Sequence, residues 1–231
     1  MQTVMITGAS RGIGLEFVSQ YHADGWRVFA CCRTPGQADE LAGIASQSDG
    51  RVTLHQLDVD DGASVAALKS ELGDQPLDVL LNNAGIIGQR DSGRGGVDYA
   101  AWQDCIVTNV FGPMRVSEVF AYNVAASKQK KLITISSKMG SIGETQATNS
   151  IVYRSSKAAV NMAMKILAND LGAQGVIITS FHPGWVRTDM GGSAADISPE
   201  ESAGGLIERF AVLTPETTGC FETWNGRAHA I

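Results

Sequence analysis

The chain has 231 residues, of which 44% are hydrophobic and 18% are charged, with 26 glycines and a formal net charge of −6. This length and composition predict a folded protein with many tight turns, and they exclude a disordered chain and a coiled coil. The acidic balance, without a clustered basic face, argues against nucleic-acid binding.

Short apolar runs alternate with segments of helical period along the chain. Predicted strands cover residues 2–7, 26–32, 51–59, 77–85, 130–137, 175–184 and 219–224. Predicted helices cover residues 13–23 and 62–72 and, with approximate ends, 37–46, 107–125 and 152–172. Apolar strands that alternate with helices are typical of a doubly wound parallel sheet with helices on both faces. No linker or repeat divides the chain, so we predict one α/β domain, residues 1–231, with about seven strands.

Targeting and metal signals are absent from the sequence. No apolar run approaches the roughly 18 residues that span a bilayer, and no signal peptide precedes the first apolar run. The four cysteines form no CxxC pair, and none of the four histidines belongs to an HExxH-type pair. We therefore expect a cytoplasmic protein with reduced cysteines, no membrane partner and no metal site.

The connection between the first strand and the first helix is rich in glycine and reads TGASRGIG, residues 7–14. Gly8 lets the chain leave the strand sharply, Gly12 lets the backbone approach a pyrophosphate, and Gly14 lets the helix pack closely on the sheet. The helix N-terminus then offers free N–H groups and a positive dipole end to a phosphate. This strand–turn–helix context favours a Rossmann-type dinucleotide site over an ordinary glycine-rich turn, and the lack of Gly-Lys-Ser/Thr excludes a P-loop.

The end of the second predicted strand indicates which dinucleotide binds. An NAD site usually carries Asp or Glu about 20 residues past the glycines, where it bonds the ribose 2′-OH. This chain has Cys31-Cys32-Arg33-Thr34 there, and Arg11 in the glycine turn adds a second cation. Since Arg33 can pair with a 2′-phosphate, we expect NADP, with NAD as the alternative. Both arginines are also compatible with solvated surface positions.

Tyr153 and Lys157 lie four residues apart in a predicted helix, so both project from one face. A tyrosine with a pKa near 10 is a poor acid at neutral pH, whereas a nearby ammonium lowers that pKa. The pair can then exchange a proton with a carbonyl or alcohol oxygen. Taken alone, the YxxxK spacing is equally typical of an exposed helical pair.

The segments TGASRGIG, LDV, NNAG, TNVFG, ITISS, YRSSK and HPGWVRTDM follow one another between Thr3 and about Gly226. In this order they resemble the short-chain dehydrogenase/reductase family, and YRSSKAAVN further resembles its small carbonyl-reductase branch of C-factor-like and Sniffer-like proteins. The resemblance implies hydride transfer between a nicotinamide and a small carbonyl or alcohol substrate, with the protein supplying placement and the proton. It also implies a homodimer or homotetramer, built on the helices that begin near Asn109 and Tyr153.

The same resemblance implies roles for individual residues. Tyr153 would be the general acid/base, Lys157 would lower its pKa and bind the nicotinamide ribose, and Ser137 would hold the substrate oxygen. Asn109 would hold a water that relays protons to the lysine. The cofactor-binding candidates from the glycine turn and the resemblance are Gly8, Ser10, Arg11, Gly12, Ile13, Gly14, Arg33, Asp58, Val59, Asn83, Ala84, Gly85, Tyr153, Lys157, Pro183, Gly184, Val186 and Thr188.

Two features depart from the family pattern. Ser137 and Tyr153 are 16 residues apart, a longer gap than is usual in the family, which indicates an insertion in GETQATNS. The insertion leaves Ser136 as the alternative to Ser137 for the residue that faces the substrate. The stretch Asp189–Glu200 is short where many relatives carry a longer covering segment. We therefore expect an open pocket, or one that a partner subunit completes.

The substrate itself is not specified by the sequence. The candidate pocket wall is mostly apolar, which favours an aldehyde or ketone with a hydrophobic body, although the same residues are typical of a core: Ile86, Ile87, Met139, Trp185 and Met190. Arg90 and Arg94 either recognise an acidic group or are solvated loop residues. Two other functions stay open: a dinucleotide-binding regulator with little turnover, and an epimerase or dehydratase, for which we find no second acid/base motif.

Overall fold

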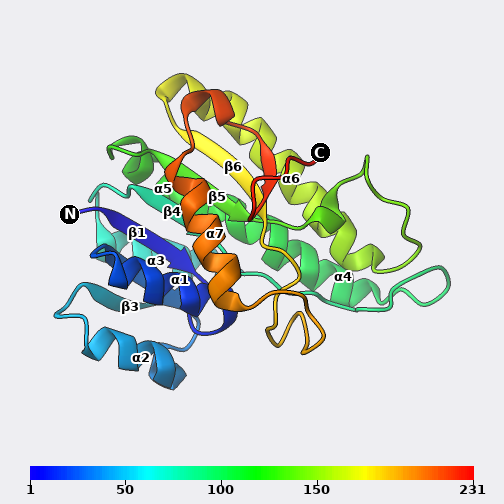
Figure 1. Ribbon diagram of the computed structural model, residues 1–231, viewed down its shortest axis with the longest axis horizontal. Helices are drawn as coiled ribbons and strands as arrows, with labels where there is room; N and C mark the ends of the chain where they lie inside the picture. The colour runs from blue at the N-terminus through cyan, green and yellow to red at the C-terminus, as the bar shows by residue number, and fades with distance from the viewer.

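The computed structural model describes all residues, 1–231. Seven parallel strands form one sheet in the order β3-β2-β1-β4-β5-β6-β7, which confirms the predicted doubly wound architecture (Figure 1). The strands are β1 (Thr3–Thr7), β2 (Arg27–Cys32), β3 (Val52–Gln56), β4 (Val79–Asn82), β5 (Lys131–Ile135), β6 (Ile177–His182) and β7 (Phe221–Thr223).

Helices cover both faces of this sheet (Figure 1). They are α1 (Gly12–Ala23), α2 (Asp39–Ser46), α3 (Gly62–Leu72), α4 (Tyr99–Ile106), α5 (Gly112–Ala125), α6 (Ile151–Leu171) and α7 (Pro199–Ala211). None of the helices is long and apolar enough to cross a bilayer.

The strands alternate their side chains between two apolar layers. On β1, Val4 and Ile6 pack with α1, α2 and α7, whereas Met5 packs with α3, α5 and α6. Because successive strand residues point to opposite faces and both faces are covered, a central strand such as β1 is apolar on both of its faces. This coverage of both faces explains why such strands appear in the sequence as continuous apolar runs rather than as alternating ones.

The order of strands determines where a ligand site lies. The chain winds from β1 to β3 in one direction and then returns to place β4 on the other side of β1. The crossovers therefore diverge between β1 and β4, and a crevice opens beyond their carboxyl ends. The glycine turn follows β1, and Asn83-Ala84-Gly85 follows β4, so both segments lie at this point.

Helix α7 is missing from the sequence prediction. Its start carries a capping box, in which the Ser198 hydroxyl accepts from the Glu201 N–H and the Glu201 carboxylate accepts from the Ser198 N–H. Gly204 and Gly205 weaken the helical pattern in its middle. Gly205 is required by packing, because a Cβ there would overlap the Trp224 ring. Tertiary contact thus overrides a poor local propensity.

The helix predicted over residues 107–125 has a different start. Helical structure begins at Tyr99, because Asp98 caps α4 by accepting from the Ala100 and Ala101 N–H groups. Between α4 and α5 lies one π-helical segment, Val107–Phe111. The predicted strands are also longer than the observed ones: at Leu57–Asp61, for example, the chain leaves the sheet because Asp58 accepts from the Asp60 N–H.

Candidate active site

A cleft of about 590 Å³ lies beyond the carboxyl ends of the central strands. It is lined by every predicted cofactor-binding residue except Gly184 and Val186. Those two residues pack away from the opening: a Cβ on Gly184 would overlap Ile197, and Val186 is buried and pairs with Ile197.

The glycine turn fits a diphosphate. Gly8 and Gly12 have φ of 67° and 55°, in the left-handed region that favours glycine, and a Cβ at Gly14 would overlap the Gly8 carbonyl. No side chain caps the N-terminus of α1, so its first N–H groups are free to donate to a ligand. The residues present therefore match a dinucleotide pyrophosphate.

The turn is held in place by the segment after β4. The Asn83 amide donates to the carbonyls of Thr7 and Gly8 at 3.0 and 3.2 Å. In return, the Thr7 hydroxyl accepts from the N–H groups of Asn83 and Ala84, both at 3.0 Å. The role of Thr7 was not predicted, although the residue stands directly before the first glycine.

The end of the cleft near β2 carries both signs of charge. Cys32 is buried, Arg33 and Glu40 are exposed, and all three line the cleft. The Arg11 guanidinium lies 3.4 Å from the Asp189 carboxylate in an exposed ion pair. Arg33 therefore has the position expected for contact with a 2′-phosphate, whereas Glu40 is a carboxylate at the same end that the sequence reasoning missed.

Tyr153 and Lys157 are both buried on α6, which excludes an exposed helical pair. Lys157 Nζ donates to the Ile135 carbonyl at 3.0 Å and lies 5.7 Å from the centre of the Tyr153 ring. Burial lowers the pKa of Lys157 to about 8. Burial also raises the pKa of Tyr153 to about 12, with a hydrogen bond to Ser137 acting in the opposite direction. The expected lowering of the tyrosine pKa by the lysine is therefore not observed, and desolvation dominates.

The two candidate serines have different surroundings. Ser137 neighbours Tyr153 by that hydrogen bond, and its hydroxyl also accepts from the Met139 N–H at 3.1 Å, capping the 3₁₀ turn Lys138–Gly140. Ser136 lines the cleft, and its buried hydroxyl has no partner within the chain. Ser137 therefore shares the immediate surroundings of the tyrosine, while Ser136 offers a free hydroxyl close by.

Asn109 lies in the π-helical segment and is fully buried. Its Oδ1 accepts from the Ile86 N–H at 2.8 Å, and its amide donates to the Ile86 carbonyl at 2.8 Å and to Ser156 Oγ at 3.0 Å. Cys105 Sγ lies 3.2 Å from the same amide nitrogen. Cys105, four residues before Asn109, and Ser156, on α6, were not singled out in the sequence, because neither residue type carries a motif of its own there.

The candidate pocket wall is only partly assembled around the cleft. Ile86 and Met190 line it, Ile87 and Met139 pack beside Tyr153, and Trp185 is about half exposed.

The segment after β6 is held by its own bonds and by the loop that follows β4. The Arg187 guanidinium donates to the carbonyls of Ala195 and Asp196, and Arg90 donates to the carbonyl of Met190 at 2.8 Å. Arg90 therefore bonds this segment from an exposed position.

Comparisons with known proteins agree with this geometry. The profile of the family described as short chain dehydrogenase matches residues 2–197. A 1-hydroxy-2-glutathionyl-2-methyl-3-butene dehydrogenase of Rhodococcus sp. (strain AD45) is 33% identical over 232 residues, 98% of each chain. Among solved structures, the carbonyl reductase Sniffer of D. melanogaster superposes with a TM-score of 0.91 at 30% identity, covering 100% of both chains. An NADPH-bound carbonyl reductase from chicken fatty liver gives 0.91 at 33% identity, covering 100% of this chain and 99% of that one.

The burial of Lys157 predicts a pH-dependent cost to stability. Below pH 8 the lysine is charged in both the folded and the unfolded chain, and its burial opposes folding; between about 8 and 10.5 only the unfolded chain holds the proton, so this cost declines. Lys157→Met should therefore raise the free energy of unfolding at pH 7 by about 1–3 kcal/mol, and the gain should vanish near pH 10.5. Urea unfolding at both pH values measures this difference.

The exposed Lys128 provides the control, since Lys128→Met should leave stability nearly unchanged at either pH. A Lys157→Met gain that did not depend on pH would show that the lysine charge is not its source.

Proposed function

The chain belongs to the short-chain dehydrogenase family, and from this membership we propose that it is an NADP-dependent carbonyl reductase with Tyr153 as the general acid/base. The observation that carries the proposal is the joint burial of Tyr153 and Lys157 in the cleft that the glycine turn opens. A protein that only bound a dinucleotide would not need to bury an ionisable pair at this cost.

Different residues of the cleft would bind different parts of the cofactor. The glycine turn and the N-terminus of α1 would bind the diphosphate, and Arg33 would bind the adenosine 2′-phosphate. A bound nicotinamide supplies the hydride. Tyr153, which is protonated at neutral pH as any tyrosine is, would donate a proton to the carbonyl oxygen.

Lys157 and Ser137 would assist this proton transfer. A protonated Lys157 would favour the phenolate that forms as Tyr153 gives up its proton, which lowers the tyrosine pKa during the reaction rather than before it. Ser137 would orient the substrate oxygen beside Tyr153. Asn109 bonds both the N–H and the carbonyl of Ile86, and so fixes this residue of the cleft wall.

The substrate class follows from the same wall. Ile86 and Met190 offer an apolar surface, which supports an aldehyde or ketone with a hydrophobic body. The four cysteines are all free, in keeping with a reducing, cytoplasmic location, which we include in the proposal.

Tyr153→Phe tests the role of the tyrosine. The variant lacks the proton donor, so kcat for carbonyl reduction with NADPH should fall by at least about 100-fold. The Kd for NADPH should stay within about twofold, because the ring itself is retained. Tyr99→Phe, at an exposed position, serves as the control. Should Tyr153→Phe keep its turnover, or a biological effect survive without turnover, the regulatory alternative would gain.

The charges near β2 allow a paired test of cofactor choice. If Arg33 reads a 2′-phosphate, wild-type protein binds NADPH at least tenfold tighter than NADH, about 1.4 kcal/mol, and Arg33→Ala removes this preference by weakening NADPH alone. Glu40→Gln should then change NADH binding little. Fluorescence titration of the three proteins with both cofactors measures the ratio. A loss of NADH affinity in Glu40→Gln, with no effect of Arg33→Ala, would instead assign an NAD site.

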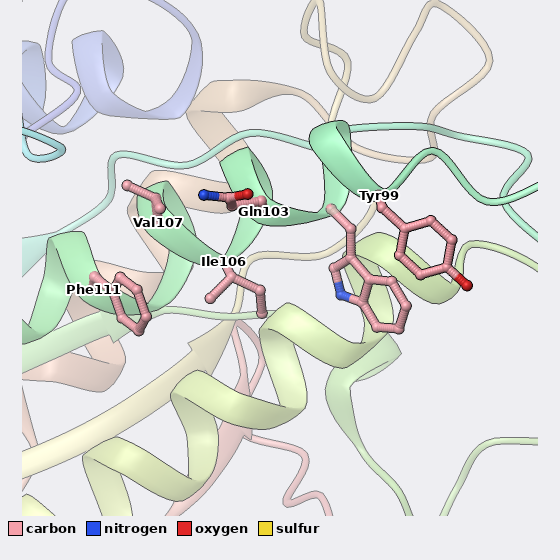
Figure 2. Close-up of a pocket in the computed structure, with 6 residues that line it drawn as sticks. Tyr99, Gln103, Ile106, Val107 and Phe111 are labelled. Carbon is pink, nitrogen blue, oxygen red and sulfur yellow. The ribbon is translucent and has the colours of Figure 1, made fainter.

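Self-association is also part of the proposal. Figure 2 shows Tyr99, Gln103, Ile106, Val107 and Phe111 around a shallow, mostly apolar pocket of about 300 Å³ on α4 and the π-helical segment. Helices α5 and α6 also carry exposed apolar side chains, namely Tyr122, Met162 and Ile166. We therefore infer that two copies pair through α4, α5 and α6, as the family resemblance implies.

Ile166→Glu tests this pairing. Ile166 is 61% exposed in the single chain, so the substitution should leave a monomer folded but place a charge in the proposed interface. Sedimentation velocity should show a dimer or tetramer for the wild type and dissociation for the variant. Val212→Glu, at a similarly exposed position after α7, should not change the mass. A monomeric wild type would contradict the inference.

A further inference from the structure

The chain folds back on itself after β7 (Figure 1). Glu222 pairs with Ala228 as an antiparallel bridge, and the Thr223 N–H donates to the Arg227 carbonyl at 2.8 Å. The His229 N–H donates to the Phe221 carbonyl at 2.8 Å. We call residues 226–231 the C-terminal strap. Its backbone bonds give the strap a defined path at the end of the sheet.

The strap places His229 in a buried position. Its side chain is 2% exposed and lies between the rings of Phe221 and His182. Nδ1 is 2.9 Å from the Glu144 carboxylate, and Nε2 bonds the Thr223 hydroxyl. Because a carboxylate only accepts, Nδ1 donates to it, which leaves Nε2 of a neutral ring to accept from Thr223. Both ring nitrogens are therefore satisfied, and breaking either bond leaves a buried polar atom without a partner.

Glu144 receives this contact from a distant part of the chain, 85 residues away. The N–H of Ala230 also bonds its carboxylate, and the Arg227 guanidinium lies 4.0 Å away. The hydrogen bond from His229 lowers the pKa of Glu144, so the carboxylate is charged at neutral pH. Through Glu144, the strap is thus bonded to a second part of the chain besides β7.

Glu144 belongs to the loop of residues 141–150, which joins the 3₁₀ turn after Ser137 to the start of α6. At its far end, Arg154 donates to the Asn149 carbonyl at 3.1 Å and lies 3.3 Å from the Thr145 hydroxyl. Arg154 directly follows Tyr153. The loop is therefore held at one end beside Tyr153 and at the other by the strap, and it contains the insertion that distinguishes this chain from the family pattern.

We propose that Glu144 and His229 are positioning residues that fix the 141–150 loop on the substrate side of Tyr153, and that the C-terminal strap thereby determines how well a carbonyl substrate binds. The inference rests on the proposed function for its kinetic consequences. Neither residue lines the cofactor cleft. The strap should therefore affect the binding of the carbonyl compound and leave the binding of NADPH unchanged.

The kinetic test uses Glu144→Ala in the full-length chain with NADPH and a panel of apolar aldehydes and ketones. KM for the carbonyl substrate should rise at least about fivefold, while kcat and the Kd for NADPH stay within about twofold. Glu144→Gln keeps an acceptor oxygen for His229 and should bring KM back to near the wild-type value. Glu144→Ala/His229→Ala should raise KM no further than Glu144→Ala alone, since both changes remove one contact. Glu208→Ala, on the exposed face of α7, is the control.

A second measurement does not depend on turnover. Hydrogen exchange followed by mass spectrometry should show faster exchange in residues 141–150 in Glu144→Ala and in His229→Ala, with α6 unchanged. If the wild type reduces no carbonyl, the proposed function fails, but the exchange data still test whether the Glu144–His229 contact holds the 141–150 loop in place. An unchanged KM, an unchanged exchange rate, a KM in Glu144→Gln equal to that in Glu144→Ala, or a matching loss of NADPH binding would each overturn the proposal.

Discussion

The structure depends on the reversal of winding between β1 and β4. Two adjacent parallel strands whose crossovers diverge leave a crevice that no helix fills, and the chain uses this space for its cleft. The reversal would not define a site without the reciprocal bonds between Thr7 and Asn83. These bonds join the segments that follow the two strands, and so hold the glycine turn in the one conformation in which its N–H groups face the opening. The position of the diphosphate site is therefore a property of the sheet and of one amide side chain.

The chemical part of the cleft is assembled at a cost in stability. Tyr153 and Lys157 are ionisable groups in an apolar layer, and desolvation raises the pKa of one to about 12 and lowers that of the other to about 8. Burying such a pair costs folding free energy, and this cost is the reason for which we propose that the pair serves the reaction. In the proposed reaction, a protonated Lys157 would favour the phenolate that forms as Tyr153 gives up its proton.

The substrate side is built from elements that are distant in the sequence. The loop after β4, the segment after β6, the 141–150 loop and the C-terminal strap all meet around α6 and the end of the sheet. Each is held by side chains that bond to backbone carbonyls or to a single carboxylate, such as Arg90 at Met190 and His229 at Glu144. The cofactor cleft is thus framed by the sheet and the glycine turn, whereas the substrate side depends on long-range polar contacts.

The sequence by itself determined the doubly wound sheet, the glycine turn and the presence of a Tyr153–Lys157 pair on one helix face. These features follow from local chemistry: apolar runs, glycine φ angles and a spacing of four residues. It did not reveal α7, in which Gly205 is needed because Trp224 packs against it, nor the π-helical segment that carries Asn109. Only the tertiary structure decided the pKa values of Tyr153 and Lys157, the partners of Asn109 and the hydrogen bond from His229 to Glu144. Burial and contacts across 85 residues leave no local pattern in the chain, because they arise from the way separate elements pack.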